Sequence, residues 1–386
     1  MNCENCGKIK KNKKRGFLKN LAVKYHTFIF TLRFIPNFKA FFRLFRGYLR
    51  VNILRKDQIR LVEIFVTLDC NAKCHFCSNG LFTKKKGDLS FEKYIEIIDE
   101  CAKLNVPLVC LIGGEPLLYD RLNDLIKRIN KHGMISMIST NGSLLTESRI
   151  KELKSCGLSS IAISLHSMDE AAHDAVLKIP GSYRRSFLAK DYCDKYGINF
   201  LMASVVSRSD FINGGFDKLV DFVTKKKVPL SINPIIPTGY ANTEKDELLT
   251  FHDVQKLNKI SAESNYVSTH LTNNFFGFGC PAGNGYVGVN ATGEMFPCFF
   301  IPVSLGNVKE ISLKKAWEKA CKSPLFTARH KMCYAGVSRE FIQNYMDPIF
   351  KFENIPIPIE SHPKYNKNIG GLEDLKINDV KKAVLE

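Results

Sequence analysis

The stretch that decides the fold is residues 61–77, LVEIFVTLDCNAKCHFC, in which a strand-like run leads directly into three closely spaced cysteines. Cys70, Cys74 and Cys77 have a C-x3-C-x2-C spacing. In parallel α/β architectures, the position just after a strand is its carboxyl end, where reactive groups gather. The spacing therefore predicts a functional site at this edge of a sheet.

The same strand begins a regular alternation of strand and helix patterns. The strand-like runs are Leu61–Leu68, Pro107–Ile112, Ile135–Thr140, Ser160–Leu165, Asn199–Val206 and Pro229–Ile235. The helical patterns are Phe91–Leu104, Arg121–His132, Glu147–Ser155, Tyr183–Tyr196 and Phe216–Lys225, and another helix is expected near Phe251–Glu263. Such alternation indicates βαβ units and a parallel sheet. Six units are fewer than the eight of a closed barrel, so the predicted fold is α/β, a partial (β/α)6 TIM-type barrel.

Three thiolates hold three irons of a cubic [4Fe–4S] cluster and leave the fourth iron open to a ligand. A zinc site is one alternative, with His75 as the available fourth ligand, although His75 adjoins Cys74 and points differently from the cysteines in most local geometries. Unliganded buried cysteines are the other alternative. Three such cysteines within eight residues after a strand would be a rare accident.

Three further segments end later strands and carry groups suited to binding a ligand. Gly113-Gly114-Glu115-Pro116 follows the second strand. Its glycines allow close backbone approach to a ligand and its glutamate can accept from an ammonium group, although an ordinary Gly-rich turn has the same composition. Ser139-Thr140-Asn141-Gly142 ends the third strand and Ser164-Leu165-His166 ends the fourth. All three segments are expected at the same edge as the cysteines.

Together with Phe76, which precedes the third cysteine, these motifs resemble the radical S-adenosylmethionine (SAM) superfamily over residues 60–240. The resemblance implies that SAM chelates the open iron. One electron from the cluster then breaks the sulfonium C–S bond of SAM, which gives methionine and a 5′-deoxyadenosyl radical. This radical abstracts hydrogen from a substrate. The implied SAM contacts are Phe76, Gly113, Gly114, Glu115, Thr140, Asn141 and Ser164. His166 replaces the usual acid and is interpreted as a satisfied histidine; the resemblance assigns no catalytic residue.

The C-terminal segment resembles the SPASM/Twitch extension of the same family. It contains Cys280, a G-x-x-x-P-C motif ending at Cys298, Leu305–Val308 and Trp317. The predicted hairpin has strands Tyr286–Val289 and Glu294–Phe296. The resemblance implies one auxiliary cluster held by Cys280, Cys298 and Cys333, with the fourth position open or filled by Cys321, His330 or substrate. A clusterless or zinc-bound hairpin is the alternative.

Positive charge is concentrated at the N-terminus. The 386 residues have a net charge of +18, and residues 1–60 alone hold sixteen Lys or Arg against two acids. Residues 17–35 and 38–50 look helical, and the second forms a basic amphipathic pattern. Three interpretations of residues 8–60 remain open. The segment could bind an anionic membrane surface, or it could bind an acidic peptide or nucleic acid. In the third interpretation its helices pack on the barrel and leave a solvated basic face.

The predicted units are residues 1–58, a basic extension; 59–240, the barrel; 241–350, the auxiliary-cluster domain; and 351–386, a tail. The thirteen cysteines do not form the even framework of a short secreted chain, and neither a signal peptide nor an apolar run of about 18 residues is found. The expected location is cytoplasmic, peripheral to the inner membrane where the extension binds lipid.

The predicted activity is radical SAM modification of a peptide or protein, with a lipid or membrane-bound precursor as the second candidate. A reductant such as flavodoxin or ferredoxin is the expected partner. The alternative from another class is a non-catalytic metal-binding protein that binds nucleic acid or a protein partner. That alternative predicts no 5′-deoxyadenosine formation.

Overall fold

The computed structural model describes residues 32–81, 87–270, 280–323, 326 and 333–364. Its sheet contains all six predicted barrel strands: β1 (Leu61–Phe65), β2 (Leu108–Ile112), β3 (Ile135–Thr140), β4 (Ser160–Ser164), β5 (Asn199–Val206) and β6 (Leu230–Pro234). They lie side by side in chain order and every neighbouring pair is parallel. The predicted parallel α/β sheet is confirmed.

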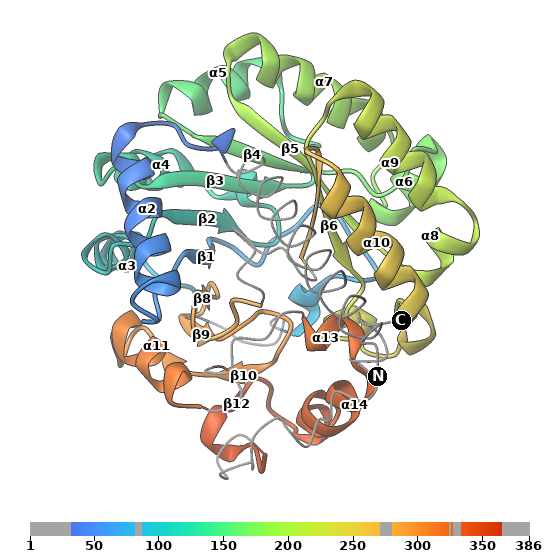
Figure 1. Cartoon of the computed structure of the whole chain (residues 1–386). Helices are drawn as coiled ribbons and strands as arrows, with labels where there is room; N and C mark the ends of the chain where they lie inside the picture. Colours follow the sequence, from blue (N-terminus) through green and yellow to red (C-terminus); the bar gives the residue numbers. More distant parts are fainter. Residues whose placement is uncertain (1–31, 82–86, 271–279, 324–325, 327–332, 365–386) are drawn as a thin grey trace, which may run out of the picture.

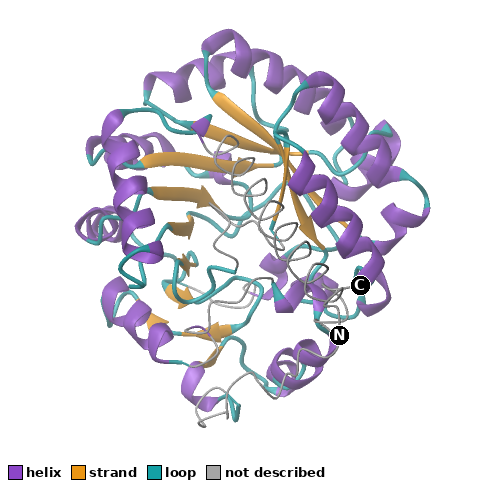
Figure 2. Cartoon of the chain, viewed as in Figure 1, coloured by secondary structure: helices purple, strands orange, loops and turns teal. Residues whose placement is uncertain are grey.

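Helices cover the outer face of this curved sheet (Figures 1 and 2). They are α3 (Phe91–Lys103), α4 (Leu122–Lys131), α5 (Glu147–Ser155), α6 (Glu170–Leu177), α7 (Ser182–Tyr196), α8 (Arg208–Ile212), α9 (Gly215–Lys226) and α10 (Phe251–Glu263). The short helices α6 and α8 were not predicted. A seventh parallel strand, β7 (Val267–Thr269), follows α10 and pairs with β6, so the sheet continues beyond the predicted sixth unit.

Each barrel strand presents alternate residues to two different environments, as the period of a β-strand requires. On β1, Val62 and Ile64 are fully buried in the core between sheet and helices. Leu61, Glu63 and Phe65 face the barrel interior and line a cavity there. The cavity is therefore built by the half of each strand that does not contact the outer helices.

The predicted C-terminal hairpin forms with the predicted bounds, β8 (Tyr286–Val289) and β9 (Glu294–Phe296). The sequence did not indicate that β8 pairs in parallel with β1, with Leu61 opposite Tyr286. The hairpin thus extends the barrel sheet. α11 (Leu313–Lys322) packs beside it, and the Trp317 indole donates to the Asn284 carbonyl oxygen at 3.0 Å. The shorter elements of this region are β10 (Val303–Ser304), β11 (Gly306–Asn307), β12 (Ile357–Pro358), α13 (Tyr334–Val337) and α14 (Arg339–Phe341).

The predicted helix after Pro36 is α2 (Phe38–Asn52), and Asn37 caps it by accepting from the Ala40 amide at 2.8 Å. α2 crosses the N-terminal ends of the first strands (Figure 1). Ala40 and Leu44 pack there in one apolar cluster with Leu61, the first residue of β1. The predicted helix over residues 17–35 lies almost entirely outside the described residues.

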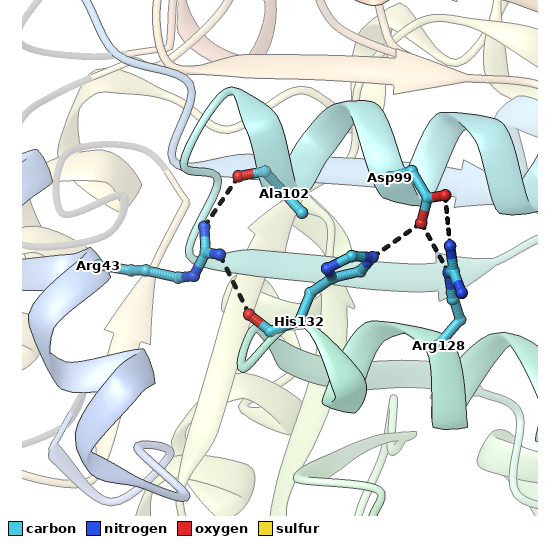
Figure 3. Close-up of polar contacts among 5 residues, drawn as sticks. All are labelled: Arg43, Asp99, Ala102, Arg128 and His132. Carbon is cyan, nitrogen blue, oxygen red and sulfur yellow. Dashed lines mark hydrogen bonds and ion pairs between the residues drawn. The ribbon is translucent and has the colours of Figure 1, made fainter.

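Arg43 links α2 to the C-terminal ends of α3 and α4 (Figure 3). Its guanidinium donates to the carbonyl oxygens of Ala102 at 3.3 Å and His132 at 3.1 Å. The His132 imidazole and the Arg128 guanidinium converge on Asp99 of α3 and lower the pKa of its carboxyl to about 2, with the Arg128 hydrogen bond as the largest cause. α2, α3 and α4 are therefore joined by one polar network.

Arg43→Ala is expected to loosen α2 without unfolding the barrel, because it removes two hydrogen bonds to backbone carbonyls. The local stability of α2 should fall by about 1–2 kcal/mol. Limited proteolysis should then cut within residues 38–52 faster than in the original protein. Arg46→Ala is the matched control, since Arg46 is exposed on the same helix. Equal cleavage rates in the two variants would contradict this role of Arg43.

The segment before α2 is attached at the opposite edge of the barrel. Arg33 donates to the Asn265 carbonyl oxygen at 2.8 Å, and its guanidinium lies 4.6 Å from the centre of the Tyr266 ring. Between these attachments, Phe34 lines the interior cavity. Within the described part of the chain, no helix has the length and hydropathy needed to cross a membrane.

Candidate active site

The three predicted cluster cysteines lie together in the loop that follows β1. Their thiols are close enough to affect one another: burial, followed by Cys77 and Cys70, raises the pKa of Cys74 to about 12. Burial is also the main cause of the raised pKa of Cys70, to about 11. This donor set of three thiols on one loop fits a [4Fe–4S] cluster with an open iron. No group of three His, Cys, Asp or Glu side chains within the described ranges is arranged to hold a single metal ion.

Gly113 and Gly114 are required by the backbone of this cysteine loop. A Cβ on Gly113 would lie 2.5 Å from the Thr67 carbonyl oxygen, and one on Gly114 would lie 2.0 Å from that of Asp69. The Gly114 amide donates to Thr67 at 2.8 Å, and the Glu115 amide donates to Asp69 at 2.7 Å. The sequence predicted that a ligand would approach the backbone of these two glycines closely. In the structure, the backbone of Thr67 and Asp69, which leads to Cys70, occupies that position.

Glu115 is fully buried and its carboxylate organises the ends of two strands. Oε1 accepts from the Thr140 hydroxyl at 2.6 Å and from the Leu117 amide at 3.2 Å, while Oε2 accepts from the Asn141 amide at 2.9 Å. Burial raises the pKa of Glu115 and the three hydrogen bonds oppose that shift. Glu115 was predicted to accept from an ammonium group, and in the structure its carboxylate accepts from donors within the protein. Two of these donors belong to Thr140 and Asn141, which were also predicted to contact SAM.

Asn71 was not singled out from the sequence, yet it contacts the predicted SAM-binding residues. It lies between Cys70 and Cys74 and accepts from the Asn141 side-chain amide at 2.8 Å. Its own amide donates to the Ser143 hydroxyl at 2.8 Å. The cysteine loop is therefore connected to the end of β3 by side chains. An Asn inside the C-x3-C spacing was the only sequence signal for this contact.

Phe76 and His166 meet at the same edge, with ring centres 5.0 Å apart. The His166 Nδ1 accepts from the Val205 amide at 3.2 Å. Burial, followed by His173 and His75, lowers the pKa of His166 to about 3, so its imidazole is neutral at ordinary pH. Ser164, two residues earlier, donates to the Thr140 carbonyl oxygen at 3.4 Å. Ser164 and His166 thus both have partners within the protein.

The predicted auxiliary-site cysteines also gather, although they come from distant parts of the chain. Cys280 and Cys333 share a hydrogen bond, which is the main cause of the lowered pKa of Cys280 and the raised pKa of Cys333. Burial, followed by Cys280, raises the pKa of Cys298 to about 12. The Cys321 thiol is instead directed to the Gly283 carbonyl oxygen, 3.7 Å away. His330 lies outside the described residues.

An interior cavity of about 300 Å3 extends from the barrel strands to the auxiliary cysteines. Its lining includes Ser139 and Ala162 from the barrel and both Cys280 and Cys298. The sequence analysis missed its charged and phenolic residues, Arg60, Glu63 and Tyr286. The available signal was Glu63 itself, an acid at an inward-facing position of the otherwise apolar run LVEIF.

Comparisons with known proteins agree with this geometry. Residues 64–215 match the model of the Radical SAM superfamily, and residues 280–335 match SPASM, described as an iron–sulfur cluster-binding domain. The chain is 26% identical over 298 residues to an AdoMet-dependent heme synthase of Methanosarcina barkeri, covering 68% of this chain and 82% of the relative. It is 26% identical over 270 residues to a PqqA peptide cyclase of Rhizobium meliloti, covering 65% and 72%.

Solved structures share the fold. The structure of Streptococcus suis SuiB bound to the precursor peptide SuiA aligns with a TM-score of 0.59 and 17% identity, over 73% of this chain and 69% of that one. Native anSMEcpe with bound AdoMet and the Kp18Cys peptide aligns with a TM-score of 0.55 and 17% identity, over 75% and 97%.

The cysteine loop, the sheet beneath it and these matches define a radical SAM enzyme. The chain belongs to the radical SAM superfamily and carries a C-terminal SPASM domain. Its cofactors are a [4Fe–4S] cluster and S-adenosylmethionine, and the SPASM domain adds auxiliary iron–sulfur binding.

Proposed function

We propose that this enzyme modifies a peptide or protein by abstracting hydrogen from an unreactive carbon. Cys70, Cys74 and Cys77 would hold the cluster, and Phe76, Gly113, Gly114, Glu115, Thr140, Asn141 and Ser164 would form the SAM site. The bound cluster and SAM supply one electron and the 5′-deoxyadenosyl radical. A low-potential reductant such as flavodoxin or ferredoxin would deliver that electron.

The observation that carries this proposal is the continuity between the cysteine loop and the barrel. Gly114 and Glu115 hold the loop through backbone bonds, and Glu115 connects it to Thr140 and Asn141. Residues from β1–β7 then enclose a cavity that reaches Cys280 and Cys298. The lining also includes Ser78, the residue after Cys77, so a substrate group within this cavity would be shielded from water, as radical chemistry requires.

A single assay tests the chemistry. Anaerobically reconstituted protein with dithionite and SAM should form 5′-deoxyadenosine, measured by liquid chromatography. The Cys70→Ala/Cys74→Ala/Cys77→Ala variant should form none, whereas Cys156→Ala should retain the activity because Cys156 lies in the apolar core at the end of α5. Absence of 5′-deoxyadenosine from the fully reconstituted protein would count against the proposed reaction.

The relatives differ in substrate, so the peptide assignment needs its own support. Their names include heme synthase, peptide cyclase and GTP 3′,8-cyclase. Two of the matching folds were solved with bound peptides. A comparison of the peptides of cells with and without the protein should reveal a mass change confined to one peptide. A change found only among lipids would instead support the membrane-bound precursor.

For the auxiliary site, we propose a single cluster bound by Cys280, Cys298 and Cys333. Cys280→Ala should lower the iron and sulfide content of the reconstituted protein by about half, because one of two clusters would be lost. Cys321→Ala is the matched control and should leave both unchanged, since its thiol is directed to Gly283. Unchanged iron in the Cys280 variant would contradict this cluster.

We also propose that α2 places the enzyme against an anionic membrane surface. Its outward side chains include Phe38, Phe42 and Phe45, which are 73%, 52% and 47% exposed. They lie beside exposed Arg46 in the N-terminal region that contains most of the net positive charge of the chain. Exposed aromatic rings next to basic residues suit the boundary between headgroups and acyl chains.

Replacing Phe38, Phe42 and Phe45 together with serine should reduce binding to vesicles of phosphatidylserine and phosphatidylcholine by at least about tenfold, because three apolar side chains no longer leave water. Co-sedimentation measures the effect. Ile212→Ser is the control, since Ile212 is 72% exposed on α8, far from α2 in the sequence. Binding that persists unchanged in the triple variant would contradict the membrane role of this helix face.

A further inference from the structure

Glu63 occupies an unusual position for an ionisable group. It lies in the middle of β1, directly across from Cys110 on β2 and from Gly288 on β8. Its side chain lies deep within the molecule yet remains partly accessible, because it faces the interior cavity. A carboxylate here is separated from bulk water but can still be reached by a molecule inside the barrel.

One side of the Glu63 carboxylate is held by Tyr286, whose hydroxyl donates to Oε2 at 2.6 Å. The ring of Phe299 packs edge-on against the ring of Tyr286, with ring centres 6.2 Å apart. The ring centres of Phe299 and Phe65 are 4.3 Å apart. These aromatic contacts fix the phenol in place. Glu63 therefore has one defined orientation, set by a neutral donor from the SPASM hairpin.

The described residues provide no cation that pairs with this carboxylate; the ion pairs they form involve other acids. Arg60 also lines the cavity, but its guanidinium lies against Gly285, in the space that a Cβ there would occupy, and its charge acts on Cys280. Burial raises the pKa of Glu63, opposed only by the Tyr286 hydrogen bond. A buried carboxylate with a single neutral donor is costly, and a cationic ligand would offset much of that cost.

The rest of the lining suits a short chain leading to such a cationic group. On the strands across the barrel, Ala162 and Ala203 leave space where larger residues would fill the interior. Next to Glu63 the wall is apolar, with Leu61, Phe65 and Leu108. Apolar walls beside one acidic group match an aliphatic stem that ends in an N–H-rich head.

We propose that Glu63 is the binding residue for a positively charged nitrogen group of the substrate, an alkylammonium or alkylguanidinium. A lysine or arginine side chain of a peptide substrate presents this chemistry, as does a free alkylamine. The inference deepens the proposed function, since it names the part of the substrate that enters the barrel. Ammonium or guanidinium donors would bind the side of the carboxylate opposite the Tyr286 hydroxyl.

The test uses the full-length reconstituted protein and simple probes, so it does not require SAM cleavage. n-Butylammonium and ethylguanidinium are compared with n-butanol, a neutral molecule of similar size, by saturation-transfer NMR titration. The original protein should bind the cations at least about tenfold more tightly than the alcohol, as expected for a charge-assisted hydrogen bond. Glu63→Gln should remove this preference while leaving butanol binding unchanged.

Two further variants locate the binding and separate charge from shape. Ala203→Leu should weaken all three probes, because it fills the cavity opposite Glu63. Tyr286→Phe should keep the cation preference, since the carboxylate remains. Iron content and thermal melting confirm that each variant is folded.

Absence of a cation preference in the original protein, or its persistence in Glu63→Gln, would overturn the inference. Either result would leave the 5′-deoxyadenosine assay unaffected, so the proposed function is judged separately. The cation could come from a peptide side chain or from a free amine. These two sources are distinguished with Nα-acetyl-lysine N-methylamide, which keeps the free side-chain ammonium group. Tighter binding of this compound than of butylammonium supports a peptide side chain, whereas its exclusion from the site overturns the peptide assignment and indicates a free amine.

Discussion

Gly114→Ala is expected to prevent stable loading of the radical SAM cluster. The new methyl group would lie 2.0 Å from the Asp69 carbonyl oxygen, a backbone atom one residue before Cys70. No rotamer relieves such a contact, so the cysteine loop must move and the hydrogen bonds from Gly114 to Thr67 and from Glu115 to Asp69 must lengthen. The variant should lose about 3 kcal/mol of stability.

Iron content and the visible absorption of the reconstituted protein measure the loss of the cluster, and chemical denaturation measures stability. Gly47→Ala is the matched control. Gly47 lies inside α2, where an added methyl group would be 3.8 Å from Gln58, so alanine should be neutral or stabilise the helix by about 0.5–1 kcal/mol. Normal iron content in Gly114→Ala would show that the loop tolerates displacement.

Glu115→Ala is expected to weaken both the fold and SAM binding. Three buried donors, from Leu117, Thr140 and Asn141, would lose their acceptor together. Each buried donor without a partner costs about 1–3 kcal/mol, so a loss of about 3–5 kcal/mol is expected after partial relaxation. The end of β3 would also lose its side-chain link to the end of β2, which holds the cysteine loop, and this should weaken SAM binding by at least about tenfold.

Denaturation of the protein without cofactors isolates the structural part of this effect, and equilibrium dialysis with SAM measures the binding part. Thr140→Val provides a graded comparison, because it removes one of the three hydrogen bonds to the carboxylate and keeps the side-chain volume. It also removes the hydrogen bond that the Thr140 hydroxyl accepts from the Gly142 amide at 3.0 Å, so its stability should fall by about 1–2 kcal/mol. If Glu115→Ala were as stable as Thr140→Val, the carboxylate would not be the centre of this network.

Much of the barrel was predictable because its signals are local. β3 and β5 have the predicted bounds, and β8 and β9 begin and end where the sequence indicated. Apolar runs, glycines and short turns act within a few residues, so a single sequence contains them. The unpredicted α6 is short, with its cap at Asp169 as the main signal.

The outward orientation of the α2 phenylalanines could not be predicted from periodicity. The amphipathic pattern predicted the helix, but two faces competed for the barrel. The face with Ala40 and Leu44 packs against β1, while Phe38 and Phe42 are exposed. The hydrogen bonds of Arg43 to the carbonyl oxygens at the ends of α3 and α4 favour this choice, and both helices are far from α2 in the sequence.

By itself, the sequence determined the class of chemistry. The spacing of Cys70, Cys74 and Cys77 after a strand, with Gly113–Glu115 after the next, predicted one site, because parallel strands bring their carboxyl ends to one edge. The resemblance of these motifs to the radical SAM superfamily then indicated the chemistry of that site. The tertiary structure alone decided what lines the interior cavity. The pairing of β8 with β1 brings Tyr286 to Glu63 and places Cys298 on the same cavity. Tyr286 and Cys298 both lie more than two hundred positions after Glu63, and only the folded sheet brings them together with it.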